Sequence, residues 1–392
     1  MRSFAAGRGY AAPLLKALGI YVGQRHQTRK GYNIKAKKMR ITQATIYLFL
    51  LVTLSACAPA PQAVSNLDGF FSDQGRVVTS ASYPTDETSR QILKSQDLVG
   101  VNALLHKRQL TPTDEQPVVR MNRDTYYSMA VVDVSQGATV TMPEVPEGKY
   151  ISVQPVTEDH RIQPMFYGAG TFDLTTHTGD HVYLIIRLDA TFSEAEAAGY
   201  QDQMVIEANS DNLFTTDAVN EESFKSIEDK LKAEMLVIAK RDGKDALVGM
   251  FTYPTDASNE LFTQEKYEAG AAVGWGGAQE IDNIYEISPN YPADTCHQAT
   301  FTDPKNKAFW SITVYNKAGF MFNDLANLSS NNATPNDDGT YTISFGCGED
   351  ALNNIKTAND SGVFNLAVRH YQPSELVSVE GFRVLPAVKA VN

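Results

Sequence analysis

The chain has 392 residues, and its 34 Lys and Arg face 46 Asp and Glu, which gives a formal net charge of −12 at pH 7. The first 56 residues carry ten of these basic residues and no acidic one, so the remaining 336 residues carry a charge near −22. A chain this acidic offers no basic surface to a phosphate backbone, which excludes nucleic acid as a partner. Its length is sufficient for two domains.

The first 56 residues have the pattern of a secretory leader with a lipoprotein processing box. Ile46–Leu54 is an apolar run that follows a basic segment, and it is too short to cross a bilayer, which needs about 20 apolar residues. The sequence Leu54-Ser55-Ala56-Cys57 comes next, and it is typical of cleavage before a lipidated cysteine. Residues 1–38 are either an overcalled translation start or a long n-region. An ordinary secreted protein and an apolar core strand are the alternatives.

On this interpretation the mature protein begins at Cys57 and is anchored to a membrane by its acyl chains. Each buried methylene contributes about 0.8 kcal/mol, so several chains together hold a soluble domain durably. Ala58 and Pro59 follow with no acidic residue beside the cysteine, a pattern that favours the outer membrane. We therefore expect a lipid-anchored protein of the bacterial cell envelope that faces the periplasm or the cell surface.

The first part of the mature chain changes from a tether to a β-rich segment. Residues 57–79 are predicted as a tether because they begin with a stretch rich in Pro, Ala and Ser. A helix is predicted from about Thr85 to Leu104. Alternating β-branched and aromatic residues then predict strands over 125–132, 149–153 and 181–187.

One amphipathic helix, which begins after a predicted cap at Asn220, separates the first strand-rich part of the chain from the second. Five apolar residues lie on one stripe of this helix, as is typical of core packing: Phe224, Ile227, Leu231, Met235 and Ile238. Strands are predicted over 309–315, 341–345 and 363–369, and a turn over 335–339.

This pattern predicts a mainly β chain with two β-sandwich or jelly-roll-like domains joined by helices. The first β domain is expected over 80–215 and the second over 286–392. Residues 216–285 are expected to form a helical connector between them.

Cys296 and Cys347 form an even pair in a compartment where disulfides persist. A bond between them would close a loop of about 50 residues and contribute on the order of 4 kcal/mol in the chain-entropy model. Two buried free thiols are the alternative. A zinc site is not favoured, because only His297 lies beside them.

A first polar cluster lies just before the strand at 125–132. If Arg120, Asn122 and Asp124 lie in a strand, they share one face and can bond to each other or to a polar ligand. A salt-bridge network that fixes the entry of the strand is the alternative. The candidate ligand-binding residues are Arg120, Asn122, Arg123, Asp124, Tyr127 and His160.

A second cluster, Glu158-Asp159-His160, follows the strand that ends near Val156. A carboxylate beside a histidine can orient it for proton transfer or metal binding, which makes these three residues the candidate catalytic group. Adjacent residues cannot all point the same way, so a solvated charged loop is the alternative. No cofactor is predicted, and a divalent metal is left open.

Other motifs carry less chemistry. His177 and His181 are separated by Gly179-Asp180, which breaks a helix, and they are interpreted as turn residues. Gly274-Trp275-Gly276-Gly277 lacks the Lys-Ser or Lys-Thr of a phosphate loop and predicts a tight turn. The sequence contains neither a Gly-x-Ser-x-Gly elbow nor His-Glu-x-x-His.

Several of these segments together resemble a known family. The matching stretches are 100–102, His106, 119–125, 127–128, 158–160, 167–171, 274–277, 308–316, 335–339 and 382–388. Over residues 80–390 the chain resembles the bacterial two-domain family that combines the domains of unknown function 1254 and 1214 (DUF1254 and DUF1214). The resemblance implies β-sandwich domains and makes a homo-oligomer plausible, but it implies no reaction. Leu105 departs from the family pattern, and the Cys296 and Cys347 pair is an addition.

These observations favour an envelope lipoprotein that binds a small polar ligand, a glycan or a protein partner through its first β domain. One alternative is a hydrolase that uses Asp159 or Glu158 with His160 as acid and base. Another is a purely structural envelope protein. The hydrolase alternative requires that the two polar clusters line one pocket.

Overall fold

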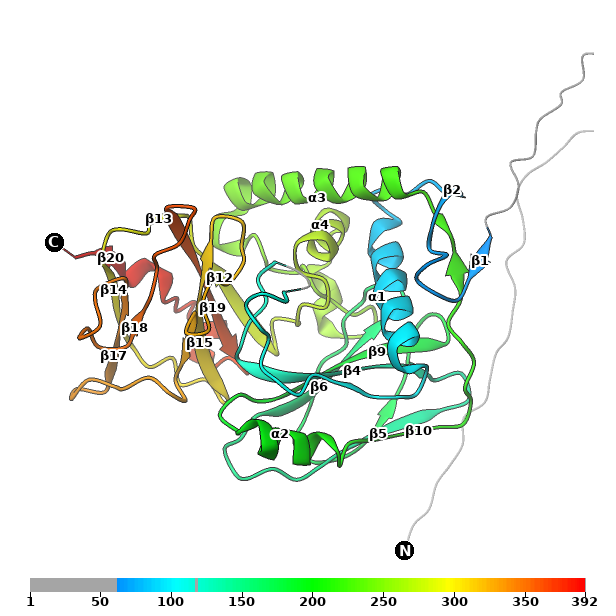
Figure 1. Ribbon diagram of the computed structural model, residues 1–392, viewed down its shortest axis with the longest axis horizontal. Coiled ribbons are helices and arrows are strands. Elements are labelled where there is room, and N and C mark those ends of the chain that lie inside the picture. Colours follow the sequence, from blue (N-terminus) through cyan, green and yellow to red (C-terminus); the bar gives the residue numbers. More distant parts are fainter. Residues whose placement is uncertain (1–61, 117–118, 392) are drawn as a thin grey trace, which may run out of the picture. The chain divides into compact units, whose positions relative to one another are not determined.

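Two groups of β-sheets dominate the computed structural model, which describes residues 62–116 and 119–391 (Figure 1). The predicted leader over 1–56 and Cys57 lie outside the described residues. The mainly β fold class predicted from the sequence is confirmed. No helix in the described ranges is long and apolar enough to cross a membrane.

The first half of the chain contains a five-stranded and a three-stranded sheet, both antiparallel. The five-stranded sheet has the order β3 (Leu105–His106), β4 (Thr125–Asp133), β9 (His181–Asp189), β6 (Ile151–Thr157), β7 (Phe166–Tyr167). The three-stranded sheet has the order β10 (Val205–Ala208), β5 (Ala138–Met142), β8 (Gly170–Leu174).

The five-stranded sheet is covered on both faces, and all nine residues of β9 are buried. Tyr183 and Ile185 of β9 pack into the cluster that contains the helices, whereas Leu184 and Ile186 pack against the three-stranded sheet. Because successive side chains of a strand point to opposite faces, a strand buried on both sides is apolar without interruption. This explains the continuous apolar run that the sequence shows here.

Helices cover the face of this sheet opposite to β5 and β10 (Figure 1). These helices are α1 Tyr83–Val99, α3 Glu221–Asp242 and α4 Gln264–Gly274, with short 3₁₀ turns η2 Gly243–Asp245 and η3 Ala257–Leu261. Helix α2, Glu194–Gln201, lies on the other face, where its Ala197 packs in the same cluster as Val140 of β5. The predicted Asn220 cap is present, since its side chain accepts a hydrogen bond from the backbone N–H of Ser223. Phe224 and Leu231 of α3 lie in the same core as Val131 of β4, so residues of the predicted connector are packed on the first sheet.

The predicted tether needs correction over its described part. Residues 63–64 form β1 and pair with β11 (Thr216–Asp217), and Phe71–Arg76 form β2. Phe70 is fully buried in the core beneath α3. Burial of an aromatic side chain stabilises by about 1.5–3 kcal/mol, which outweighs the flexibility that the local composition suggests.

The second half is a β-sandwich. One sheet has the order β12 (Asn283–Ile287), β19 (Val363–Tyr371), β15 (Phe309–Asn316), β16 (Asn327–Ser329), and β13 (Tyr291–Pro292) also pairs with β19. The other sheet has the order β18 (Asn354–Ile355), β17 (Thr340–Phe345), β14 (His297–Thr302), β20 (Val388–Ala390). Helix α5 (Glu375–Ser378) and η4 (Leu385–Ala387) complete this half. Phe301, Trp310 and Phe345 pack between the two sheets.

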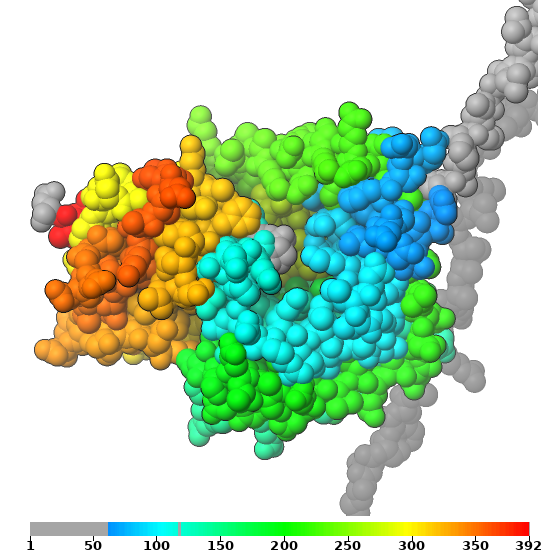
Figure 2. All heavy atoms as spheres, viewed as in Figure 1, coloured from blue at the N-terminus to red at the C-terminus, as the bar shows by residue number. Residues whose placement is uncertain are grey.

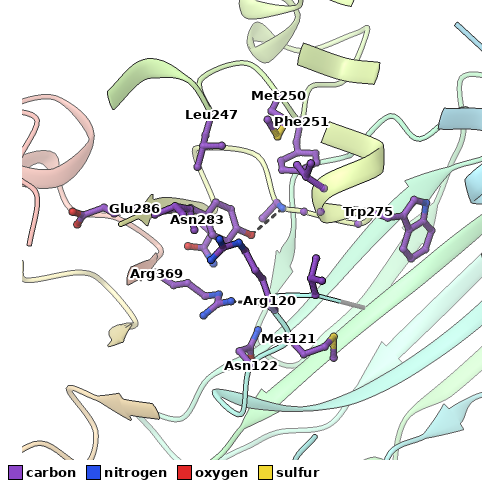
Figure 3. Close-up of a pocket in the computed structure, with 18 of the residues that line it drawn as sticks. Arg120, Met121, Asn122, Leu247, Met250, Phe251, Trp275, Asn283, Glu286 and Arg369 are labelled. Carbon is purple, nitrogen blue, oxygen red and sulfur yellow. Dashed lines mark hydrogen bonds between the residues drawn. The ribbon is translucent and has the colours of Figure 1, made fainter. Parts of the chain in front are cut away.

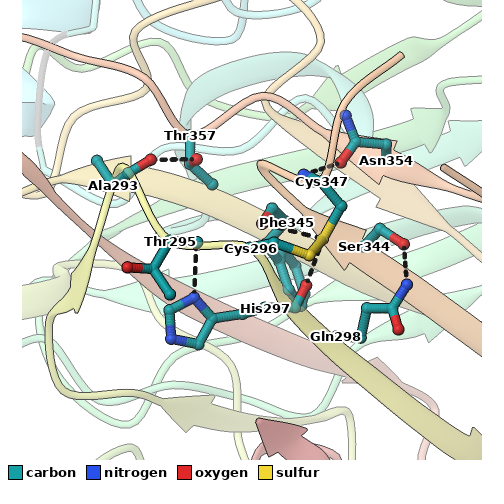
Figure 4. The surroundings of a disulfide bond; sticks show 10 residues. All are labelled: Ala293, Thr295, Cys296, His297, Gln298, Ser344, Phe345, Cys347, Asn354 and Thr357. Carbon is teal, nitrogen blue, oxygen red and sulfur yellow. Dashed lines mark hydrogen bonds between the residues drawn. A yellow bond between two sulfur atoms is a disulfide. The ribbon is translucent and has the colours of Figure 1, made fainter. Parts of the chain in front are cut away.

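The predicted disulfide is present between Cys296 and Cys347, with 4.5 Å between the two Cα atoms (Figure 4). Cys296 directly precedes β14, and Cys347 follows β17, the antiparallel partner of β14. The bond therefore links β14 to β17 at one end of the sheet that these two strands share.

The two halves meet at the sheet of this sandwich that contains β15 and β19. Tyr150 of the first half packs edge to face on Phe309 and Tyr371, at ring-centroid distances of 5.5 and 5.6 Å. Met121 packs on a second cluster that contains Tyr315. Residues 62–116 and 119–391 belong to one compact unit.

Candidate functional site

A cavity of about 1490 Å³ lies among the five-stranded sheet, the helices and the β12–β19 edge of the second half. Small-molecule sites usually measure about 300–1,000 Å³, so this space can take a ligand of considerable size. Figure 2 shows the surface hollowed between the green residues of α3 and the cyan residues of the first half. The cavity is open to solvent on this side.

One side of the cavity, called the floor here, is polar. Tyr127 of β4 and Arg187 of β9 form part of it. Tyr127 and Arg187 are direct partners in the antiparallel register of these strands. Arg187 is 7% exposed, and its Nη1 donates to Oε1 of Gln154 at 2.7 Å. The Gln154 amide in turn donates to the carbonyl of Gly276 at 2.9 Å. This chain of contacts fixes the guanidinium against the turn that forms another part of the lining.

Arg120 extends the polar floor toward the second half. Its backbone has a left-handed φ of 59°, and its carbonyl accepts a hydrogen bond from Nη2 of Arg369 at 2.8 Å. Its own Nη1 donates to Oδ1 of Asn365 at 3.0 Å. Burial lowers the pKa of Arg120, and the nearby charge of Arg369 adds to this effect. The site thus holds two guanidinium groups close together at the junction of the halves.

The opposite wall is apolar. Figure 3 shows Leu247, Met250 and Phe251 on one side of the cavity and Arg120 and Arg369 on the other. Further apolar lining comes from Met129, Ile185, Val273 and Trp275. A ligand with one polar end and an apolar body matches this division.

The charge of the lining is opposite to that of the chain. It contains three acidic residues, Glu115, Glu280 and Glu286. The basic residues are Lys94, Lys107, Arg108, Arg120, Arg187, Lys232, Lys240, Lys244, Lys317, Arg369 and Arg383. An acidic protein has thus concentrated cations around one cavity, which favours anionic ligands there.

The structure places three of the six predicted ligand-binding residues in this lining, namely Arg120, Asn122 and Tyr127. Nδ2 of Asn122 donates to the phenol oxygen of Tyr127 at 2.9 Å. Arg123 points elsewhere, because its Nη1 donates to the carbonyl of Thr111 at 2.7 Å. The alternation predicted from a strand is only partly realised, since β4 begins at Thr125.

Asp124 does not line the cavity but joins the two halves. Its Oδ2 accepts hydrogen bonds from Oγ of Ser311 at 2.6 Å and from the phenol of Tyr371 at 2.9 Å. Its Oδ1 accepts from Asn327 at 3.1 Å, and Arg369 lies 3.9 Å away. For Asp124 the structural alternative given above is therefore the one that the contacts support.

His160 lies buried behind the lining. Its Nε2 accepts a hydrogen bond from the backbone N–H of Gly276 at 3.0 Å, and its ring stacks on Trp275 with 6.0 Å between centroids. Burial lowers the pKa of His160 to about 3, so the imidazole is neutral. It supports the Trp275–Gly277 turn from behind, and its side chain is 2% exposed.

Glu158 and Asp159 point away from His160 and do not line the cavity. Oε1 of Glu158 accepts from the backbone N–H groups of Asp180 and His181, both at 2.9 Å, and Oδ2 of Asp159 contacts Nε2 of His177 at 2.9 Å. Burial opposes the charge of His181, but the contact with Glu158 raises its pKa.

The structure therefore does not assemble the acid/base group that the sequence suggests. The physical reason is the turn at His160, whose φ of 61° sends its ring inward while the two carboxylates stay with the β9 entry. His181, interpreted from the sequence as a turn residue, is the first residue of β9. Within the described residues no group of three or more His, Cys, Asp or Glu side chains could hold a metal ion.

Sequence reasoning missed Arg187, Arg369 and Tyr285, all of which line the cavity. The two arginines each interrupt an apolar strand near its end, in β9 and in β19. A cation in a strand that is otherwise apolar was the available signal, because such a residue is buried only with polar partners or a ligand.

Comparison with family models gives two matches in chain order. A model described as protein of unknown function DUF1254 matches residues 101–216, and one described as protein of unknown function DUF1214 matches residues 292–375. The chain belongs to this two-domain family. The DUF1254 region supplies β4 and β9 of the site, and the DUF1214 region supplies β19. The resemblance recognised in the sequence is thereby confirmed.

Two solved structures are similar to this chain over most of its length. The VPA0106 protein from Vibrio parahaemolyticus is 17% identical, with a TM-score of 0.58 over 80% of this chain and 98% of that one. An uncharacterised protein from Burkholderia cenocepacia is 15% identical, with a TM-score of 0.48 over 80% of this chain and 87% of that one. The first likeness supports the fold. Comparison with curated proteins gives no match.

Proposed function

We propose that this protein is a noncatalytic ligand-binding lipoprotein of the bacterial envelope, which holds a small organic molecule in the cavity between its two β-rich halves. The observation that carries the proposal is the cavity of about 1490 Å³, which has a polar floor of arginines and tyrosines and an apolar opposite wall. Envelope anchoring rests on the processing box before Cys57.

The contacts of the floor arginines and of His160 support binding rather than acid/base catalysis by the predicted Glu158-Asp159-His160 group. Arginine does not lose its proton in proteins, so the cations of the floor cannot exchange protons with a substrate. His160 faces the turn and not the cavity. The floor is therefore suited to hold a polar group of the ligand in a fixed orientation. The opposite wall, with Phe251 and Trp275, is suited to contact the apolar body of the ligand.

The proposal is tested by titrating the protein with N-phenyl-1-naphthylamine, a neutral aromatic probe whose fluorescence rises in apolar surroundings. We expect saturable binding of one probe per chain and a rise in melting temperature, because a ligand that binds only the folded state stabilises it by mass action. Absence of saturable binding would contradict the proposal.

A pair of tryptophan variants locates the bound probe. Leu247 lines the cavity, so Leu247→Trp fills part of it and should weaken probe binding at least tenfold. Leu213 is 57% exposed and lies outside the lining, so Leu213→Trp is the matched control and should bind as the parent does. Equal binding by both variants would place the probe elsewhere and refute the proposed site.

A further inference from the structure

Arg187 is a buried cation without a carboxylate partner. Among the described residues no acidic oxygen lies within 4 Å of its guanidinium nitrogens, and its polar contacts there are Oε1 of Gln154 and the sulfur of Met165. Its Nε and Nη2 make no hydrogen bond within the described ranges, yet neither is among the fully enclosed unpartnered atoms. Both donors are thus accessible from the cavity that Arg187 lines.

A buried charge without a counter-ion lowers the stability of a folded protein, so the position of Arg187 suggests that a ligand supplies the missing charge. The penalty for removing an ion from water is several kcal/mol even after relaxation, and proteins normally offset it with a counter-ion. Arg120 and Arg369 lie at the same floor, so the positive charge there is not that of Arg187 alone. Asp124 lies 3.9 Å from Arg369, but within the described residues no carboxylate forms an ion pair with Arg187 or Arg120.

Three buried carboxylates of the two halves are already engaged. Asp124 accepts from Ser311, Tyr371 and Asn327, as described above. Asp282 accepts from the backbone N–H of Met165 at 3.0 Å and from the phenol of Tyr167 at 2.8 Å. Glu286 accepts from His370 at 2.8 Å and from two backbone N–H groups of the second half. None of these groups can turn to Arg187 without breaking buried hydrogen bonds.

Two tyrosines present further donors to the same space. The phenol oxygen of Tyr127 accepts from Asn122, and that of Tyr285 accepts from the backbone N–H of Ala278 at 3.2 Å. Within the described residues neither phenol proton has an acceptor, so both are free to donate. Burial raises the pKa of Tyr285, which keeps it protonated. The floor therefore combines the cationic donors of Arg187 with the neutral donors of Tyr127, whose ring centroid lies 5.8 Å from the guanidinium carbon, and of Tyr285.

We infer that the ligand is an organic anion, with its carboxylate, sulfonate or phosphate group held by Arg187 and Arg120 and by the phenols of Tyr127 and Tyr285. Its apolar body lies against Phe251 and Trp275. The inference rests on the proposed function and names the chemical class that the cavity selects. A charge-assisted hydrogen bond of this kind is about twice as strong as a neutral one.

The test compares two probes that differ only in the anionic group. 1-Anilinonaphthalene-8-sulfonate is N-phenyl-1-naphthylamine with an added sulfonate. We expect the sulfonate to bind the parent protein at least tenfold more tightly than the neutral probe. Arg187→Gln should abolish this preference, whereas Arg241→Gln, which removes an exposed cation outside the lining, should retain it. Circular dichroism checks the fold of each variant.

A competition experiment supports the conclusion independently of any variant. Decanoate should displace the sulfonate probe from the parent protein at concentrations at which decan-1-ol does not. If Arg187→Gln fails to fold, Arg120→Gln and this competition decide the matter. Displacement by vesicles of phosphatidylglycerol but not by decanoate would assign the anion to a lipid headgroup, and the reverse would assign it to a free acid.

The two proposals fail in different ways. If neither probe binds in the cavity, the proposed function is wrong. If the neutral probe binds there as tightly as the sulfonate, or if Arg187→Gln keeps the preference, the anionic class is wrong and the binding site stands.

Discussion

Replacing His160 with glutamine should remove a large part of the acid sensitivity of this protein. The imidazole is buried as the neutral form, with a pKa of about 3 in the folded state against an ordinary value of 6.5. Below pH 6.5 the unfolded chain takes up a proton at His160 that the folded protein does not accept. Stability therefore falls as pH decreases from 6.5 toward 3 and is fully present above 6.5.

The size of this effect follows from the two pKa values. At pH 5 the unfolded histidine is almost fully protonated and the folded one is not, so linkage removes about 2 kcal/mol relative to pH 7.5. The glutamine side chain in His160→Gln does not titrate and can still accept from the N–H of Gly276. The variant loses the stacking on Trp275, which costs about 1 kcal/mol at pH 7.5.

Urea unfolding of the parent and of His160→Gln at pH 7.5 and pH 5.0 measures this difference. Other titrating groups, including His181 with its raised pKa, are common to both proteins and cancel in the subtraction. The variant should be about 1 kcal/mol less stable at pH 7.5 and about 1 kcal/mol more stable at pH 5.0. Equal losses of stability by both proteins between the two pH values would refute the buried neutral imidazole.

Three further perturbations have defined outcomes. Asp124→Asn should lower the free energy of unfolding by about 3 kcal/mol in urea, because it disturbs three buried hydrogen bonds between the halves, and a change below about 0.5 kcal/mol would contradict this role. Serine at both Cys296 and Cys347 should cost on the order of 4 kcal/mol, measured against the oxidised parent, and unchanged stability would show that the bond contributes nothing. Cys57→Ala should abolish labelling by radioactive palmitate and release the protein from the membrane fraction, and retained labelling would disprove the lipidation site.

Much of the fold could be predicted because its signals are local. The strand pattern of β4, β15 and β19 alternates within a few residues, and the Asn220 cap acts on an N–H only three residues away. The end of α1 was predicted too late, near Leu104. Gly100, with a φ of 84°, ends that helix at Val99.

The candidate site was harder to predict because its residues meet through long-range packing. Tyr127 and Arg187 are 60 positions apart and become neighbours only through the register of β4 and β9. Arg369 reaches the carbonyl of Arg120 from the other half of the chain. Conversely, Glu158 and His160 are close in sequence, but the left-handed turn separates their side chains. Adjacency in sequence therefore suggested a group whose side chains do not meet, whereas residues that line the cavity together are far apart in the sequence.

The most direct test of the central claim is a crystal structure of the protein with bound decanoate. The carboxylate should lie within hydrogen-bond distance of the Arg187 guanidinium, and the hydrocarbon chain should contact Phe251 and Trp275 inside the cavity. Decanoate bound only at surface lysines, with the cavity empty at a saturating concentration, would contradict the claim that this cavity is a binding site for organic anions.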